Sequence, residues 1–389
     1  MTSADGRVLS GRAAIAGVGA TEFSKDSGRS ELRLAVDAIL DALDDAGLGV
    51  KDVDGLVTFT IDNNDEIEVA KSLGIRELTF FARTPYGGGP CCTTVQLAAM
   101  AVATGVAEVV VAYRAMNERS GRRFGQPALQ PLPRHAWYSP FGLATPASRV
   151  ALLARRYMHE TGATSEDFGR VSVIDRKHAA TNPKAWFHGR PITIEEHQAS
   201  PWVVDPLRRL DCCQESDGGV AIVVTSVARA RSLRQRPVVI RAAASGSALG
   251  QEAMTSYYRP HVAALPEMEI VGRQLWDEAG IRPADLDVAI LYDHFTPLVL
   301  IQLEALGFCG RGEAPDLMRT PGYFDLDGEL PLNPHGGLLG EAYIHGLNGI
   351  AEAARQVRGT AANQIDEVEN VLVTGGTMVP TSALVLGPL

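Results

Sequence analysis

The stretch YGGGPCC at residues 86–92 places two cysteines beside a small-residue pattern, TTVQLAAMAVATG, that predicts a helix. The positive end of a helix dipole lowers the pKa of a nearby thiol, so Cys91 and Cys92 are candidate nucleophiles. The three glycines allow another interpretation, in which the backbone approaches a ligand there and the reactive groups lie elsewhere. The choice between the two depends on where the fold places this helix.

Lysine and metal chemistry are less well supported by the residues. A Schiff-base enzyme needs a lysine in a dry site, whereas the five lysines all stand in polar contexts. They are Lys25, Lys51, Lys71, Lys177 and Lys184. His294, His345 and Asp293 could form a ligand set, but no HxH or HxxxH spacing accompanies them. We therefore expect no metal.

The composition excludes several classes of protein. The chain has 389 residues, a net charge of −10, and no basic run with interleaved aromatics that would indicate nucleic-acid binding. No apolar run approaches a membrane span, and MTSADGRVLSG lacks the pattern of a signal peptide. The five cysteines include two adjacent pairs, which suit neither a disulfide framework nor a zinc site. We expect a cytoplasmic protein without nucleic-acid or membrane partners.

One strand–helix–strand pattern occurs twice along the chain. The ranges are 13–20, 30–48 and 52–59 in the first copy, and 237–246, 271–281 and 285–295 in the second. The helix ends, DDAGLGVKDVD and DEAGIRPADLD, align without a gap. Two copies of one unit predict a duplicated α/β fold. We place the halves at 1–230 and 231–389, with an insertion at about 118–206 in the first half.

Four stretches carry a resemblance to a known family: RKHAATNPKAW, DPLRRLDCCQESDGGVAIVVTS, LYDHFTPLVLIQLEALGFCG and NPHGGLLGEAYIHGLNG. Through them nearly the whole chain resembles the thiolase superfamily, in its sterol-carrier-protein-x and lipid-transfer-protein branch. The resemblance implies a thiolase-like α/β fold, with two duplicated five-layered α/β halves packed into one αβαβα unit. It also implies an acyl-CoA site where the halves meet.

The resemblance moves the nucleophile position away from both cysteines. In thiolases the buried helix ends in a glycine about 17 residues after the nucleophile, and that glycine corresponds to Gly105. Counting back places the nucleophile position on Gly88, whereas Cys92 lies one helical turn too late. We therefore interpret Cys91 and Cys92 as buried packing residues.

The remaining catalytic positions of a thiolase are also substituted. Tyr292 stands where the family has a catalytic histidine or asparagine, and Tyr343 stands where it has a second histidine. Val373 replaces the second cysteine. Without a thiol there is no acyl-enzyme, so the resemblance favours a reaction that needs only a thioester enolate and a proton shuttle. Retro-aldol cleavage of a β-hydroxyacyl-CoA is such a reaction.

In this interpretation Tyr292 and Tyr343 are the acid and base, in either order, because tyrosine can do both once its pKa is adjusted. A nearby cation or hydrogen-bond donor could lower that pKa. The candidates are His294, His335 and His345, and we place Asp293 with the catalytic residues as well. The glycines assigned to the acyl-CoA and oxyanion region are Gly88, Gly336, Gly337 and Gly340. No separate cofactor is expected, since CoA is part of the substrate.

Within the family, the motifs YGGG, YDHF and EAYIHG are most similar to those of actinobacterial steroid side-chain-cleaving aldolases. That resemblance implies cleavage of a 17-hydroxy steroid C20-carboxyl-CoA to a 17-ketosteroid and propionyl-CoA. It implies a homodimer within a hetero-complex, whose partner is the DUF35 domain (an OB-fold with a zinc ribbon) of a hydratase subunit. Two alternatives stay open: a cysteine-dependent acyl-CoA thiolase, and a non-catalytic carrier or scaffold with the thiolase fold.

Overall fold

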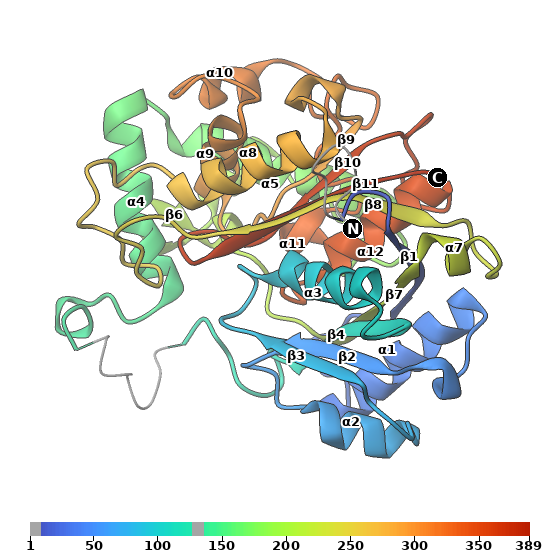
Figure 1. Cartoon of the computed structure of the whole chain (residues 1–389). Helices are drawn as coiled ribbons and strands as arrows, with labels where there is room; N and C mark the ends of the chain where they lie inside the picture. Colours follow the sequence, from blue (N-terminus) through green and yellow to red (C-terminus); the bar gives the residue numbers. More distant parts are fainter. Residues whose placement is uncertain (1–8, 127–135) are drawn as a thin grey trace.

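The computed structural model describes residues 9–126 and 136–389 (Figure 1). The strands are β1 Ala13–Ala20, β2 Gly55–Phe59, β3 Phe80–Thr84, β4 Val109–Asn117, β5 Trp202–Val204, β6 Leu207–Arg208, β7 Asp217–Ser226, β8 Val238–Gly246, β9 Val288–Ile290, β10 Val371–Thr374 and β11 Thr381–Gly387. The helices are α1 Glu31–Ala46, α2 Glu66–Leu73, α3 Cys91–Thr104, α4 Pro146–Thr161, α5 Ser165–Thr181, α6 Ile194–Ala199, α7 Val227–Ala230, α8 Pro266–Ala279, α9 Thr296–Leu306, α10 Ala314–Arg319, α11 Gly337–Gly340 and α12 Leu347–Arg358.

The main sheet of the described residues is symmetrical about its middle. Its order is β3-β2-β4-β7-β1-β8-β11-β10-β9, so β1, β7, β4 and β2 correspond to β8, β11, β10 and β9. Strands β3, β2 and β4 run parallel to one another, as do β9 and β10, while β7, β1, β8 and β11 pair antiparallel. This order is what two copies of one α/β unit produce, and the boundary near residue 230 stays a prediction.

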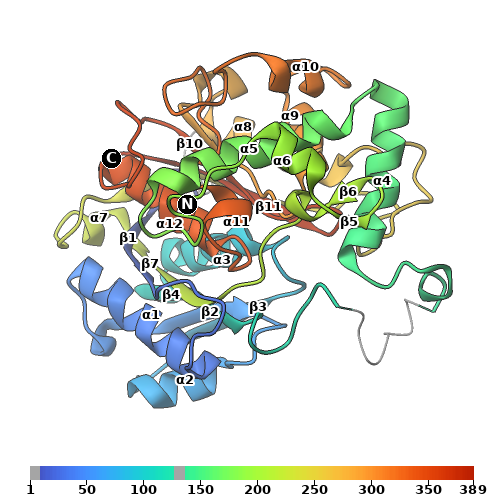
Figure 2. The ribbon, with the colours of Figure 1, turned by 180° about the vertical axis from the view of Figure 1, so that it is seen from behind.

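Helices α3 and α12 lie between the two halves of the sheet. Helix α3 packs against β2, β4 and β7 on one side and against β8 and β11 on the other, and α12 contacts β7 and β10. Helix α1 covers the outer face of the first half and α8 the outer face of the second (Figures 1 and 2). Because both halves of the sheet bury it, α3 is apolar around most of its circumference, whereas α1 keeps one polar face.

Two aspartates that align in the repeated helix ends make the same contacts in both halves. The carboxylate of Asp54 accepts hydrogen bonds from the backbone N–H groups of Glu108 and Val109, where β4 begins. Asp287 accepts from Glu369 and Asn370, just before β10. In each half a carboxylate thus fixes where the next parallel strand begins.

The predicted insertion contributes helices to the second half rather than to the first. Helix α5 packs against α9, α10 and α11, and α6 packs against α5. The glycine-containing segment at α11 is therefore covered by a helix far away in sequence (Figure 2). Among the helices of residues 9–126 and 136–389, none is long and apolar enough to cross a membrane.

Candidate active site

The parallel strands of both halves end at one place. Residues 87–89 follow β3, Glu118 follows β4 directly, Tyr292 lies two residues after β9, and Gly376 lies two residues after β10. All of them line a cavity of about 460 Å³. Open α/β sheets bind ligands at the carboxyl ends of their strands, and here two sets of strand ends face one another.

The cavity combines apolar walls with a few polar groups, as ligand sites do. The apolar lining comes from several distant segments: Ile61, Phe124, Pro146, Ala147, Val203, Met254, Phe295 and Val379. The polar side chains include Tyr292, His294, Tyr343 and His345. The structure thus brings together four of the five side chains predicted from the motifs.

The two tyrosines contact each other inside this cavity. The Tyr292 hydroxyl donates a hydrogen bond to the Tyr343 hydroxyl at 3.2 Å, with the rings edge to face. Tyr292 is 3% exposed. Burial raises the pKa of Tyr292 well above its usual value, and the neighbouring Tyr343 adds to that rise. Burial likewise raises the pKa of Tyr343, so both side chains are neutral phenols at neutral pH.

A closed hydrogen-bond network fixes the backbone of Tyr292. Its N–H donates to the Thr374 hydroxyl at 2.9 Å, and its carbonyl accepts from the Gln302 side-chain amide at 2.9 Å. The Thr374 hydroxyl in turn donates to the Gln302 carbonyl oxygen at 2.7 Å. All three residues are buried, so the phenol is attached to a rigid support.

The Tyr292 hydroxyl occupies the space that a side chain at position 88 would need. A Cβ added to Gly88 would lie 1.7 Å from the hydroxyl oxygen and 2.1 Å from Cζ. A Cβ at Gly346 or Gly376 would also crowd the ring, at 2.9 Å and 3.2 Å. Glycine at position 88 is therefore a requirement of the tyrosine opposite it.

The buried histidines are neutral, so of the two roles predicted for them, cation or hydrogen-bond donor, the structure favours that of a donor. Burial lowers the pKa of His294 to about 3 and lowers that of His345 well below its usual value, with Arg114 adding to the second shift. Arg114 donates from Nε to His345 Nδ1 at 3.0 Å and is itself paired with buried Asp62. Because Nδ1 accepts, the ring proton of His345 is on Nε2, which makes that atom a donor.

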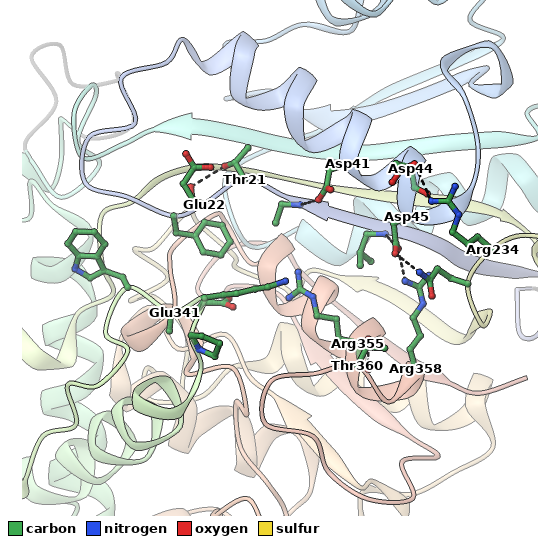
Figure 3. Close-up of a pocket in the computed structure, with 18 residues that line it drawn as sticks. Thr21, Glu22, Asp41, Asp44, Asp45, Arg234, Glu341, Arg355, Arg358 and Thr360 are labelled. Atoms are coloured by element: carbon green, nitrogen blue, oxygen red, sulfur yellow. Dashed lines mark hydrogen bonds and ion pairs between the residues drawn. The ribbon is translucent and has the colours of Figure 1, made fainter.

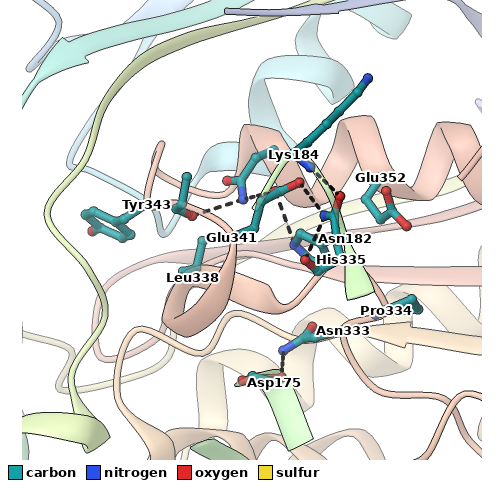
Figure 4. Close-up of polar contacts among 12 residues, drawn as sticks. Asp175, Asn182, Lys184, Asn333, Pro334, His335, Leu338, Glu341, Tyr343 and Glu352 are labelled. Carbon is teal, nitrogen blue, oxygen red and sulfur yellow. Dashed lines mark hydrogen bonds and ion pairs between the residues drawn. The ribbon is translucent and has the colours of Figure 1, made fainter. Parts of the chain in front are cut away.

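His335 lies outside the cavity, beneath the loop that carries Tyr343 (Figure 4). Its carbonyl accepts from the Asn182 side chain at 3.0 Å, and its Nε2 lies 4.0 Å from Glu341. Burial lowers the pKa of His335 to about 3. It supports the loop and does not reach the tyrosine hydroxyls.

Asp293 has a supporting role in the structure, in contrast to the catalytic role predicted for it. Its two carboxylate oxygens accept from the backbone N–H groups of Leu338 and Leu339 at 2.8 and 2.9 Å, and it does not line the cavity. Gly337 packs against this carboxylate, since a Cβ there would lie 2.3 Å from it. Asp293 therefore holds α11 against β9 and positions its neighbours, Tyr292 and His294.

Most of the glycines predicted for the oxyanion region serve packing. A Cβ on Gly336 or Gly340 would meet Ala179 of α5 at 2.5 Å, so both glycines allow α5 to approach α11. Of the four predicted glycines, Gly88 alone lines the cavity. Glycines 87, 89 and 376 also line it. The sequence signal for Gly376 was the GG of VTGGT, which follows the last parallel strand.

Four of the five cysteines form two adjacent pairs that differ in their surroundings. Cys91 and Cys92 are fully buried at the start of α3, as predicted, and neither lines the cavity. Cys212 and Cys213 do line it, which the sequence analysis missed. Burial raises the pKa of Cys92, Cys212 and Cys213, so these thiols are poor nucleophiles.

A larger cavity, of about 840 Å³, lies between α1 and α12 (Figure 3). Four of its charged side chains form ion pairs with one another: Asp44 pairs with Arg234, and Asp45 with Arg358. None of the predicted site residues lines it. The smaller cavity, which holds both tyrosines, is therefore the candidate active site.

Comparisons with known proteins agree with the resemblance to the thiolase superfamily. Residues 250–388 match the model for thiolase C-terminal domain-like sequences. The chain is 64% identical over 387 residues to the 17-hydroxy-3-oxo-4-pregnene-20-carboxyl-CoA lyase of Mycobacterium tuberculosis strain H37Rv, covering 98% of this chain and 100% of the relative. It is also 64% identical over 387 residues to the steroid side-chain-cleaving aldolase of Thermomonospora curvata, covering 98% and 99%. The solved Ltp2-ChsH2(DUF35) aldolase superposes with a TM-score of 0.94 at 64% identity, over 98% of this chain and 99% of that one, which confirms the thiolase-like α/β fold.

Proposed function

The chain belongs to the steroid side-chain-cleaving aldolases of the thiolase superfamily and is a carbon–carbon lyase acting on acyl-CoA, and we propose that its substrate is a 17-hydroxy steroid C20-carboxyl-CoA. The products are then a 17-ketosteroid and propionyl-CoA. The relative from Mycobacterium tuberculosis carries a name that describes this class of substrate. The apolar walls of the cavity suit the steroid portion of this substrate. The two tyrosines suit its β-hydroxyl, and the neighbouring histidines, as hydrogen-bond donors, suit its thioester.

Tyr343 is the base in this proposal and Tyr292 is the acid. The hydrogen bond that Tyr343 accepts from Tyr292 stabilises negative charge on the Tyr343 oxygen, and nearby Arg114 acts in the same direction. Tyr343 takes the proton of the β-hydroxyl, the Cα–Cβ bond breaks, and its electrons enter the thioester as an enolate. Tyr292 then protonates Cα.

The thioester oxygen needs hydrogen-bond donors where its negative charge develops. The Nε2–H of His345 is one candidate, since Arg114 fixes its tautomer. His294 is another: it lines the cavity, and its Nδ1 is buried with no hydrogen-bond partner among the described residues. Both rings stay neutral, so they can donate without titrating at neutral pH.

We place this chain in a hetero-complex with a DUF35 domain, as a homodimer. The support for the DUF35 partner is the 64% identity of the chain to a solved aldolase whose name pairs Ltp2 with ChsH2(DUF35), and the homodimer stays a prediction. A reasonable test of the complex is co-purification, followed by measurement of its mass in solution.

The observation that carries the proposed mechanism is the 3.2 Å contact between two tyrosine hydroxyls inside the cavity. The experiment measures propionyl-CoA and ketosteroid formed by the full-length chain, with and without a DUF35-containing partner. Tyr292→Phe and Tyr343→Phe should each lower kcat by roughly 10²–10⁴-fold, the range of general acid–base catalysis. Tyr258→Phe, at an exposed tyrosine, is the control and should retain activity. Full activity in both site variants would refute the tyrosine mechanism.

A further inference from the structure

Glu118 is a buried carboxyl in the active-site cavity to which the mechanism above gives no role. It follows β4 directly, lines the cavity with Tyr343 and His345, and is 3% exposed. Its Oε2 is buried and has no hydrogen-bond partner among the described residues. Burying a carboxylate oxygen without a hydrogen-bond partner lowers the stability of the fold, and a role in the reaction is a reason for an enzyme to keep such a group.

The surroundings of Glu118 favour a carboxyl that exchanges a proton near neutral pH. Burial raises the pKa of Glu118 to about 8, and the negative charge of Glu215 adds to that rise, while the backbone N–H of Phe124 and the guanidinium of Arg114 oppose it. The charged and titratable groups that interact with it are Glu215, Arg114, Lys25, Cys213 and Tyr343.

The charge of Glu118 also acts on Tyr343, which lines the same cavity. The charge of Glu118 is one of the causes that raise the pKa of Tyr343, so the two groups resist being ionised together. Tyr343 accepts a hydrogen bond from Tyr292 and keeps its own hydroxyl proton to donate. A neutral phenol in this position can act as a base only if it passes that proton on.

We propose that Glu118 accepts and holds the proton that leaves the substrate hydroxyl, receiving it through Tyr343. This proposal rests on the proposed retro-aldol function. It gives the neutral Tyr343 a proton acceptor that lines the same cavity. The unpartnered Oε2 of Glu118 lies beyond hydrogen-bond distance of the Tyr343 hydroxyl, so the proton crosses one intervening water.

The step balances as follows. The β-hydroxyl proton moves to the Tyr343 oxygen while the phenolic proton of Tyr343 moves through one intervening water to Glu118. The C–O bond becomes a carbonyl, the Cα–Cβ bond breaks, and its electrons form the thioester enolate. Tyr292 gives its proton to Cα and recovers one from Tyr343 along their hydrogen bond, and Glu118 returns the held proton to Tyr343. The net change is one proton transferred from the hydroxyl to Cα.

The test is the pH dependence of kcat for the full-length chain with its partner, from pH 6 to 9. The wild type should gain activity with rising pH, with a midpoint near 8, because Glu118 must be ionised to accept the proton. Glu118→Gln should lower kcat by about 100-fold, leave KM within about twofold, and remove this rise. Glu118→Asp, which keeps a titrating carboxyl, should restore the rise in part.

Glu215→Gln provides a second readout that does not depend on how well Glu118→Gln folds. Removing the neighbouring negative charge should move the midpoint of the rise to lower pH. A rise that persists in Glu118→Gln, or a midpoint that does not move in Glu215→Gln, would overturn the proposal. Failure of the proposed function looks different, since the wild type would then form no ketosteroid at any pH.

Discussion

Gly88→Ala should disable the enzyme without altering any group that carries out chemistry. The new Cβ would lie 1.7 Å from the Tyr292 hydroxyl oxygen and 2.6 Å from Cε2, whereas real Cβ atoms do not approach within 3.0 Å of other heavy atoms. The ring cannot retreat, because the backbone of Tyr292 is held by Gln302 and Thr374 and the ring is flanked by two glycines. Relief of the clash requires the phenol to leave its contact with Tyr343.

Two costs follow from this clash. Overpacking a rigid core costs about 1–3 kcal/mol of folding free energy, and loss of the hydrogen bond between the tyrosines adds about 0.5–1.5 kcal/mol. Turnover should fall by roughly 10²–10⁴-fold, as for loss of the acid itself. Gly49→Ala is the matched control, since its Cβ has ordinary contacts and its φ of −114° suits alanine.

The assay combines urea unfolding with ketosteroid formation for Gly88→Ala, Tyr292→Ala and the double variant. Because truncation of the tyrosine makes room for the new methyl group, the double variant should be more stable than the sum of the two single effects predicts. Additive effects on stability, or a Gly88→Ala enzyme with more than half of the wild-type turnover, would show that the tyrosine does not fill this space.

Three further predictions concern the support, the thiols and the histidines. Gln302→Leu should lower the free energy of unfolding by about 1–3 kcal/mol, because the Tyr292 carbonyl and Thr374 lose a buried partner. It should also reduce kcat more than it changes KM. Urea unfolding and steady-state kinetics test this, and an unchanged kcat would contradict it. Cys213→Ala should retain turnover within about threefold, whereas a thiol-dependent transferase would lose it. Because the pKa of His294 falls from 6.5 to about 3 on folding, the unfolded chain binds a proton that the folded chain does not. Stability should therefore decrease as the pH falls from about 6.5 toward 3, by up to about 1.4 kcal/mol per unit, and His294→Gln should show a shallower decrease in urea unfolding.

The repeated pattern was enough to predict a duplicated α/β fold, whereas the layered arrangement and the meeting of Tyr292 with Tyr343 were implied by the resemblance to thiolases. Strands and helices follow from periodicity, and Tyr292, two residues after β9, must lie at the sheet's carboxyl edge. Tyr343 lies in the loop between α11 and α12, which periodicity does not place. The aspartates at 54 and 287 illustrate what the repeated pattern predicts, because an aligned residue made an equivalent contact in each half.

The roles of Gly336, Gly340 and Glu118 could not be predicted in the same way. The two glycines meet α5, which comes from the insertion, and no local pattern reveals which glycine a distant helix will approach. Glu118 stands in the polar run NERSGRR, which suggests a solvated loop. Its burial depends on Asp217, whose carboxylate accepts from the backbone N–H groups of Arg119 and Ser120 and so fixes the chain just after it.

The contact between Gly88 and Tyr292 also restricts the mutational routes between this enzyme and its thiol-dependent relatives. A cysteine arriving at position 88 would need the volume that the tyrosine hydroxyl already fills. Replacing the tyrosine first would remove the proposed acid before any nucleophile existed. If the proposed mechanism holds, each route that changes one residue at a time passes through an inactive intermediate. A thiol-dependent enzyme could then arise from this one only if positions 88 and 292 changed together.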